Sequence, residues 1–294
     1  MLISIQSDGV SSMAFKDLLL TVATYSEPTS VSAIDTSVAF AAAAGAKISA
    51  LAFEIEFRMP WSPFHKAFPE IPALATSEEK KSRANAESLL AAFQDGAKKA
   101  GVFQETLVER CQISEVPEVL VGHARLRDLT IVPLPEGDQL QHWYAESIIF
   151  GSGRPVLVVP HASKRGTVFE LGRVVVAWDF SQPASRAAAD ALPILQKAKR
   201  VELLTVTNEK VMPGQRSAAD LAKNLAYHGV DVSIETEDAA GRRIGDVLGA
   251  YVDVHKTDLL VMGAYGHSRV REFVLGGATK SMLSCPPIPI LLSH

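Results

Sequence analysis

The chain has 294 residues, of which 47% are hydrophobic and 21% are charged. This length is close to twice that of a common globular domain of ~150 residues, and the composition excludes extensive disorder. The formal net charge of −4 gives no positive field for nucleic acid or an acidic membrane. No apolar run reaches the roughly 18 residues that are needed to cross a bilayer, and the first residues lack the pattern of a secretory signal. Two cysteines cannot form a disulfide framework. We therefore expect a cytoplasmic protein of two domains that binds neither nucleic acid nor membrane.

Short β-branched runs alternate with helical patterns along the chain, as in a parallel sheet with crossover helices. Strands are expected at 17–24, 47–56, 104–111, 128–132 and 155–159, and then at 173–179, 200–206, 231–236, 258–262 and 288–292. Alanine-rich helices are expected at 38–44 and 185–192 and a short helix at 278–284. Thr76 and Glu79 resemble a capping box that opens a helix to Ala100, and Gly45 and Gly101 stand where left-handed helix stops are expected.

The two halves of the chain repeat each other. The segment SEPTSVSAID, which begins at Ser26, matches SQPASRAAAD, which begins at Ser181. RDLTIV and TDLLVM align through Asp128 and Asp258, and the last strands align through Pro155 and Pro289. The repeat predicts an α/β fold of two tandem Rossmann-like domains, each a five-stranded parallel sheet with helices on both faces.

We expect the first domain at 1–162 and the second at 168–294, with a linker at 163–167. The first domain carries an insertion at about 57–76, whose prolines exclude a regular helix or a central strand and whose aromatic residues are too apolar to stay solvated. These residues are Pro60, Pro63, Pro69 and Pro72, and Phe57, Trp61, Phe64 and Phe68. The insertion either packs on its own domain or forms a flap over a cleft or a contact between subunits.

A glycine-rich segment follows the fourth strand of the second half. Gly263 and Gly266 bracket a turn, and the pair Gly276 and Gly277 precedes the short helix. Glycine lets a backbone approach a ligand closely, and a helix start directs unpaired N–H groups and the positive end of its dipole toward an anion. The segment also lies at the carboxyl end of a parallel strand, where open α/β sheets bind ligands. The spacing therefore predicts either a phosphate site or ordinary turn glycines.

This spacing resembles the tandem-domain type of the universal stress protein family. That family's nucleotide-binding pattern is G-x2-G-x9-G-(S/T) after a hydrophobic strand, with an Asp at the end of the first strand. Gly263, Gly266 and Gly276 have this spacing, and Asp179 ends the strand VVVAWD. Gly277 departs from the pattern, because it stands where the family has Ser or Thr. The resemblance covers both halves in element order, but its diagnostic residues occur only in the second half.

The resemblance implies that the second domain binds ATP, with or without Mg2+, and that the two domains pair pseudo-symmetrically through their last strands. The implied nucleotide-binding residues are Asp179, Val206, Met262, Gly263, Gly266, Gly276, Gly277, Ala278 and Thr279. Asp179 would hold ribose hydroxyls or help order a metal ion, or it is only a turn and helix-start residue. The basic residues of the loop either neutralise phosphate charge or are solvated surface groups. They are His267, Arg269, Arg271 and Lys280.

The first half lacks this pattern. Thr24 stands in place of Asp179, and Pro133 and Glu136 stand in place of the first two glycines. Because proline has no N–H and glutamate adds a negative charge, we expect no ATP in this half. Gly151 and Gly153 would at most form a turn there.

No other motif predicts a catalytic or metal-binding site. The histidines lack the spacing of metal ligands, and Lys280 is not preceded by the glycine that a P-loop requires. We therefore assign no catalytic residue and no metal ligand. Cys111 is expected in the core. We expect a stress-response regulator that hydrolyses ATP slowly or not at all. The alternatives are an interaction module without nucleotide and a weak ATPase or other nucleotide-using enzyme. A homodimer or an unknown protein partner also stays open.

Overall fold

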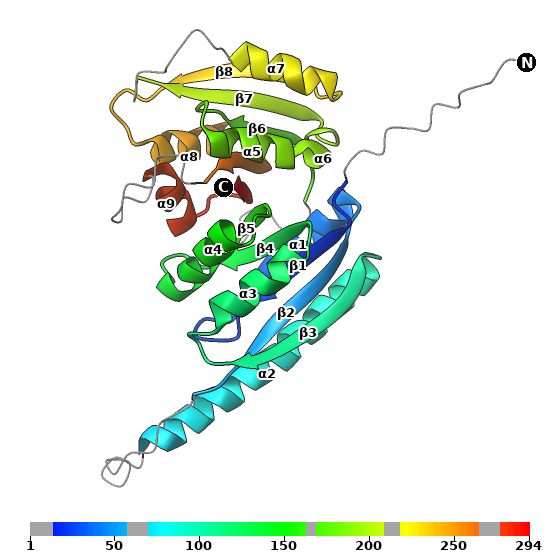
Figure 1. Ribbon diagram of the computed structural model, residues 1–294, viewed down its shortest axis with the longest axis vertical. Coiled ribbons are helices and arrows are strands. Elements are labelled where there is room, and N and C mark those ends of the chain that lie inside the picture. The colour runs from blue at the N-terminus through cyan, green and yellow to red at the C-terminus, as the bar shows by residue number, and fades with distance from the viewer. Residues whose placement is uncertain (1–13, 58–69, 163–168, 209–217, 265–276) are drawn as a thin grey trace, which may run out of the picture.

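The computed structural model describes residues 14–57, 70–162, 169–208, 218–264 and 277–294. Its strands form one ten-stranded sheet in the order β3-β2-β1-β4-β5-β10-β9-β6-β7-β8 (Figure 1). The strands of the first half are β1 (Asp17–Val22), β2 (Lys47–Ile55), β3 (Phe103–Cys111), β4 (Leu129–Leu134) and β5 (Val156–Pro160). Those of the second half are β6 (Arg173–Ala177), β7 (Arg200–Thr207), β8 (Val232–Asp238), β9 (Leu259–Gly263) and β10 (Ile290–Ser293). Each predicted strand is confirmed, with ends displaced by a few residues.

The two halves join through β5 and β10, as the resemblance implies. Within each half all strand pairs are parallel, whereas β5 and β10 pair antiparallel. Leu157 lies opposite Leu291, and these two residues occupy the same position of the repeat, since each is two residues after the matching proline. A pseudo-two-fold axis therefore passes between them, and the seam has the self-complementary geometry of an isologous dimer interface.

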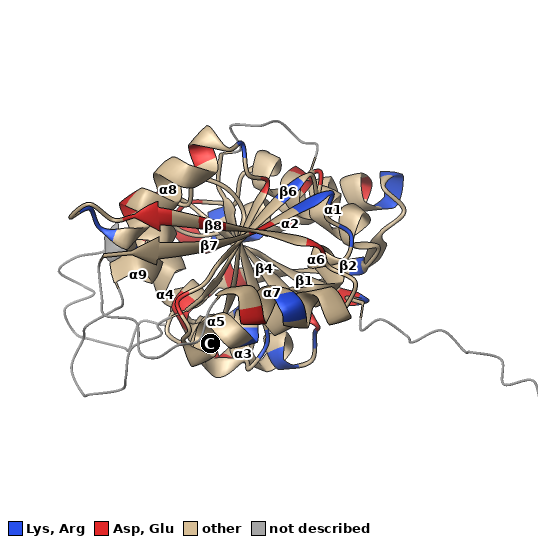
Figure 2. Ribbon diagram, turned by 90° about the horizontal axis from the view of Figure 1, so that it is seen from above, with Lys and Arg blue, Asp and Glu red and all other residues tan. Residues whose placement is uncertain are grey.

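Helices cover both faces of the sheet, as predicted, and the strands twist about the centre of the molecule (Figure 2). Along β1, Leu18 and Leu20 contribute to one core cluster and Leu19 to the other, because successive strand residues face opposite sides. The first cluster lies under α1 (Val31–Ala44), α2 (Glu70–Lys99), α5 (Gln182–Asp190), α6 (Leu192–Leu195) and α7 (Ala218–Tyr227). The second lies under α3 (Val116–Arg125), α4 (Gln139–Gly151), α8 (Ile244–Val254) and α9 (Gly277–Ser284). Strands buried on both faces explain the continuous apolar runs of the sequence.

The repeated aspartates have the same role in both halves. The Asp128 carboxylate accepts hydrogen bonds from the backbone N–H groups of Lys16 and Asp17, at 2.8 and 3.0 Å, where β1 begins. The Asp258 carboxylate accepts one from the N–H of Arg173, at 2.8 Å, where β6 begins. Each aspartate thus connects the start of the fourth strand of its half to the start of the first.

The helix boundaries differ from the prediction at the insertion. α2 begins at Glu70 rather than at Thr76, and Pro72 lies in its first turn, where its missing N–H costs no helical hydrogen bond. The predicted capping box and the exclusion of helix at Pro72 are therefore wrong. Residues 58–69, which hold most of the insertion, and the predicted linker at 163–167 lie outside the described residues. The helix stops at Gly45 and Gly101 are confirmed, with φ of 69° and 71°.

None of the helices within the described residues is both long and apolar enough to span a membrane.

Candidate functional site

The carboxyl ends of β6, β7 and β9 lie at one edge of the sheet. In the ladders, Ala177 is paired with Leu204 and Val176 with Val261. Asp179 and Val206 follow two residues after the first pair, and Gly263 follows two residues after Val261. The structure therefore brings these three predicted residues together. β6 ends at Ala177, so Asp179 lies in the turn after the strand and not at its last position.

Gly263 lies against the start of α5. A Cβ atom at this position would lie 2.4 Å from the backbone N of Ala184 and 2.6 Å from the backbone C of Pro183. These are backbone atoms, so a side chain here would displace the helix or the strand. Glycine at 263 is therefore required by packing, independently of any ligand, and it lets the start of α5 approach the end of β9.

Asp179 has the turn role that its sequence context suggests. Its Oδ1 accepts a hydrogen bond from the N–H of Ser181, at 3.0 Å, and the Ser181 hydroxyl accepts one from the N–H of Ala184, at 3.2 Å, at the start of α5. The Asp179 side chain is nevertheless exposed, and its second oxygen has no hydrogen-bond partner within the described part of the chain. The carboxylate is thus held by one oxygen and presents the other to solvent.

α9 begins at the same edge, after the glycine-rich segment. Its position depends on close contact with α8, because a Cβ atom at Gly245 would lie 2.6 Å from Cβ of Ser281. Gly277, the first residue of α9, is exposed, and a Cβ atom there would meet no heavy atom of the described residues within 4 Å. Sequence reasoning did not identify the packing role of Gly245, which only the tertiary structure reveals.

The remaining predicted residues differ in accessibility. Met262 and Thr279 are buried, at 5% and 3% exposure, whereas Val206 and Ala278 are half-buried and Lys280 is exposed. The Met262 side chain belongs to the core cluster under α8 and α9, so this residue could approach a ligand only through its main chain. Gly266 and Gly276, together with His267, Arg269 and Arg271, lie outside the described residues.

In the first half, α2 fills the position that corresponds to the space between Asp179 and Val206. The Thr24 hydroxyl donates to the carbonyl oxygen of Phe53, at 2.5 Å, and lies 2.8 Å from the hydroxyl of Ser82 on α2. Asn85, one turn further along α2, donates its amide to the Thr24 carbonyl at 3.0 Å. Ser82 is fully buried and also accepts from the N–H of Ile55 at 3.0 Å. Polar side chains of the protein thus occupy this edge of β1 and β2.

The start of α4 carries a carboxylate of the protein. Asp138 Oδ1 accepts hydrogen bonds from the N–H groups of Leu140 and Gln141, at 2.8 and 3.1 Å. An acidic N-cap accepts hydrogen bonds from the N–H groups at the positive end of the helix. These are the N–H groups that a bound anion would otherwise use. α4 is the counterpart of α9 in the repeat, and Gly151 and Gly153 lie at its other end. The glycines of the first half are therefore not the equivalents of Gly276 and Gly277.

The described residues hold no group of three or more His, Cys, Asp or Glu side chains that could bind a metal ion. Cys111 is buried, as predicted, and burial raises the pKa of its thiol to about 11. His123 lies 3.0 Å from a carboxylate oxygen of Glu109, so it has a surface partner.

The second half of the chain matches a known family. Residues 170–294 fit the model of the universal stress protein family. Universal stress protein Slr1230 of Synechocystis is 29% identical over 153 residues, a match that spans 50% of this chain and 49% of that protein. The chain therefore aligns with only about half the length of this relative.

Two solved structures share the fold over nearly the whole chain. A universal stress protein from Archaeoglobus fulgidus has a TM-score of 0.65 at 17% identity and covers 94% of this chain and 98% of its own. A putative universal stress protein from Pseudomonas aeruginosa has a TM-score of 0.54 at 12% identity and covers 95% of this chain and 93% of its own. The fold thus extends over the first half as well, and residues 170–294 match the model of the universal stress protein family.

Proposed function

We propose that this chain is a stress-response regulator that binds one adenine nucleotide, ATP, at the carboxyl edge of β6, β7 and β9. The observation that carries the proposal is the glycine pattern. It starts at Gly263, where β9 ends, and reaches Gly276, which directly precedes α9. The start of α9 offers backbone N–H groups to phosphate oxygens, and Gly277 is exposed there among the described residues.

The described residues fit an adenine nucleotide with a divalent ion. The exposed oxygen of Asp179 is an acceptor that suits ribose hydroxyls or a water ligand of Mg2+. Bound Mg2+ would neutralise part of the phosphate charge. The main chain at Val206 and Met262 would contact the base and the sugar, and Gly277, Ala278 and Thr279 at the start of α9 would contact the phosphates. Gly266 and Gly276, which lie outside the described residues, are assigned to the phosphates on the sequence pattern alone.

We place the single site in a second domain at 168–294 and assign a structural role to a first domain at 1–162. The first half offers neither a free acceptor at Thr24 nor a free helix start at Asp138, because both are engaged by the protein itself. Pro133, which is buried in β4, supplies no N–H at the position that corresponds to Gly263.

We assign a regulatory rather than a catalytic role. The carboxylate that we assign to the nucleotide is Asp179, and one of its oxygens already accepts a hydrogen bond from the N–H of Ser181, so we assign it no catalytic role. We therefore expect slow hydrolysis or none. A nucleotide-free interaction module remains the second candidate, because packing alone explains Gly263 and the family's hydroxyl is absent at Gly277.

The ligand that leaves the purified protein on heating should be identified by mass spectrometry. We expect an adenine nucleotide, close to one per chain. Gly266→Glu copies Glu136 of the first half and should abolish nucleotide binding while the protein remains folded. Gly122→Glu is the matched control, because Gly122 is exposed on α3 and a Cβ atom there meets nothing within 4 Å. Unchanged affinity in Gly266→Glu would show that the loop is misassigned, and the absence of any nucleotide binding would favour the interaction module.

A further inference from the structure

The backbone that follows Gly263 is held by the end of β10. Ala264 is fully buried, and its N–H donates to the carbonyl oxygen of Ser293 at 2.8 Å. Its own carbonyl oxygen accepts a hydrogen bond from the His294 side chain, with 3.0 Å between Nδ1 and O. The Nδ1 nitrogen therefore carries the proton, because a carbonyl can only accept. Both polar groups of Ala264 are thus fixed by two consecutive residues, one through its backbone and one through its imidazole.

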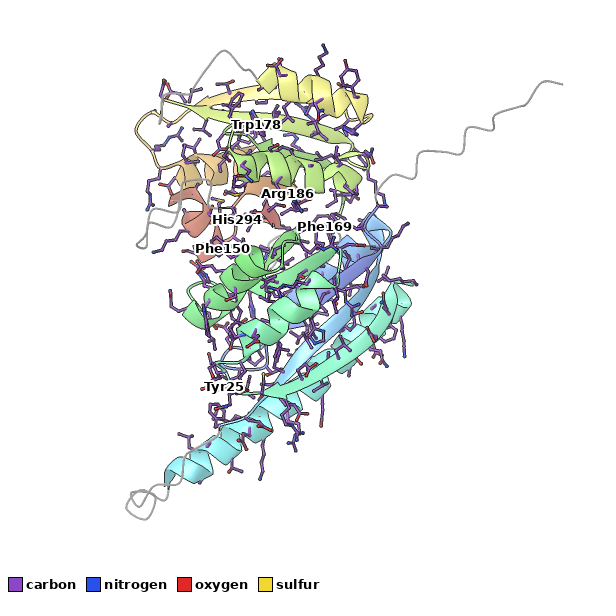
Figure 3. The ribbon with its side chains drawn as sticks, viewed as in Figure 1. Tyr25, Phe150, Phe169, Trp178, Arg186 and His294 are labelled. Atoms are coloured by element: carbon purple, nitrogen blue, oxygen red, sulfur yellow. The ribbon has the colours of Figure 1, made fainter. Side chains whose placement is uncertain are left out.

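The same imidazole packs on the first half of the chain. The His294 ring lies edge-to-face against the ring of Phe150, with 4.8 Å between centroids and 75° between planes. Phe150 lies on α4, and Figure 3 shows the two side chains at the boundary between the halves. His294 therefore contacts the residue next to Gly263 and a helix of the other half at the same time.

The halves also join through the backbone, since β10 pairs with β9 up to Gly263 and with β5 of the first half. The other side-chain contacts that join them lie away from Gly263. Phe40 on α1 packs edge-to-face on Phe169, with 5.4 Å between centroids. Arg186 on α5 donates to the Gly153 carbonyl at 3.4 Å, and Lys197 donates to the carbonyl of Ala44. Among these side-chain contacts of the described residues, that of His294 joins the backbone beside Gly263 to a helix of the first half.

We propose that His294 is a positioning residue that couples ligand binding at Gly263 to α4 of the first half. This inference rests on the proposed function. A nucleotide that binds at Gly263 restrains the next residue, Ala264, which strengthens the hydrogen bond to His294 and restrains Phe150. By linkage, the packing of Phe150 on His294 favours the backbone arrangement that binds nucleotide.

The test uses variants of the full chain that separate the hydrogen bond from the ring contact. His294→Ala removes both, His294→Asn keeps an N–H donor without the ring, and Phe150→Ala removes the ring contact from the other side. Trp143→Ala is the matched control, because Trp143 is an exposed aromatic residue of α4 whose ring contacts Tyr144. Two quantities are measured: the dissociation constant for ATP with Mg2+, by calorimetry, and the amide hydrogen exchange of residues 139–151 with and without nucleotide.

We expect His294→Ala to weaken ATP binding by about 2- to 10-fold, the effect of one lost hydrogen bond, and His294→Asn to recover most of the loss. In the wild type and in Trp143→Ala, ATP should slow exchange in α4. In all three variants at His294 and Phe150 this response should disappear, which a merely structural role of His294 would not produce. The inference is overturned if the wild type binds ATP without any change in α4, or if His294→Ala keeps both the affinity and the response. If the wild type binds no nucleotide, the proposed function fails, and this inference fails with it.

Discussion

Substitution of Gly277 should separate anion binding from folding. Gly277 is exposed, its φ does not lie in the left-handed region, and a Cβ atom there meets no heavy atom within 4 Å in the part of the chain that the structure describes. Both Ser and Asp therefore fit without displacing α9. An acidic residue in the first turn of a helix contributes roughly 0.3–1 kcal/mol through the helix dipole. Gly277→Asp should consequently keep or slightly raise the free energy of unfolding.

The effect on nucleotide binding should be opposite in sign for the two variants. An Asp carboxylate about 5 Å from one phosphate charge, at an effective dielectric constant of about 40, is repelled by ~1.7 kcal/mol, which weakens ATP binding roughly 20-fold. Gly277→Ser supplies the hydroxyl that the family pattern has at this position. One added hydrogen bond of about 0.5–1.5 kcal/mol should tighten ATP binding by about 2- to 10-fold.

Calorimetry with ATP and with adenosine distinguishes charge repulsion from a general defect. Because adenosine carries no phosphate, its affinity should be the same in wild type, Gly277→Asp and the neutral control Gly277→Ala. Thermal melting of each variant checks the fold. Wild-type affinity for ATP in Gly277→Asp would refute the placement of the phosphates at α9. Equal losses of ATP and adenosine binding would refute the electrostatic explanation.

Gly263→Ala should lower the free energy of unfolding by about 1–3 kcal/mol in denaturant titration, because its Cβ would lie 2.4 Å from the backbone N of Ala184; an unchanged midpoint would contradict this packing. Asp138→Ala should lower the free energy of unfolding by about 1 kcal/mol, because it removes the N-cap of α4. The dissociation constant for ATP should stay unchanged, and a changed constant would place a ligand in the first half. Burial raises the pKa of the Cys111 thiol to about 11, so a thiol reagent at pH 8 should modify only the exposed Cys285 in the folded protein. In urea the reagent should modify both cysteines. Rapid modification of two thiols in the folded protein would contradict the burial of Cys111.

The sequence predicted the strands because parallel strands buried on both faces have continuous apolar runs that local composition reveals. The repeat also located Asp128 and Asp258, which share one equivalent hydrogen bond, from the N–H of Asp17 and from the N–H of Arg173. The start of α2 was missed because proline is tolerated in a first helical turn.

The contacts that fill the first half were not predictable in the same way. Ser82 and Asn85 are ordinary polar residues in a helical pattern, and only the packing of α2 on β1 and β2 gives them partners at Thr24. The packing role of Gly263 depends likewise on the neighbouring α5, which is about 80 residues away in the sequence. The sequence pattern thus located the edge of the sheet, whereas the tertiary structure determines which of its groups are already engaged.

The most direct test of a single site is calorimetric titration of the full chain with ATP and Mg2+, after removal of any nucleotide that co-purifies. We expect one ATP per chain, since the first half is filled by α2 and Asp138 and the second presents Asp179 and the start of α9. Two ATP per chain would contradict the filled first half, and no binding by the folded protein would contradict the nucleotide site.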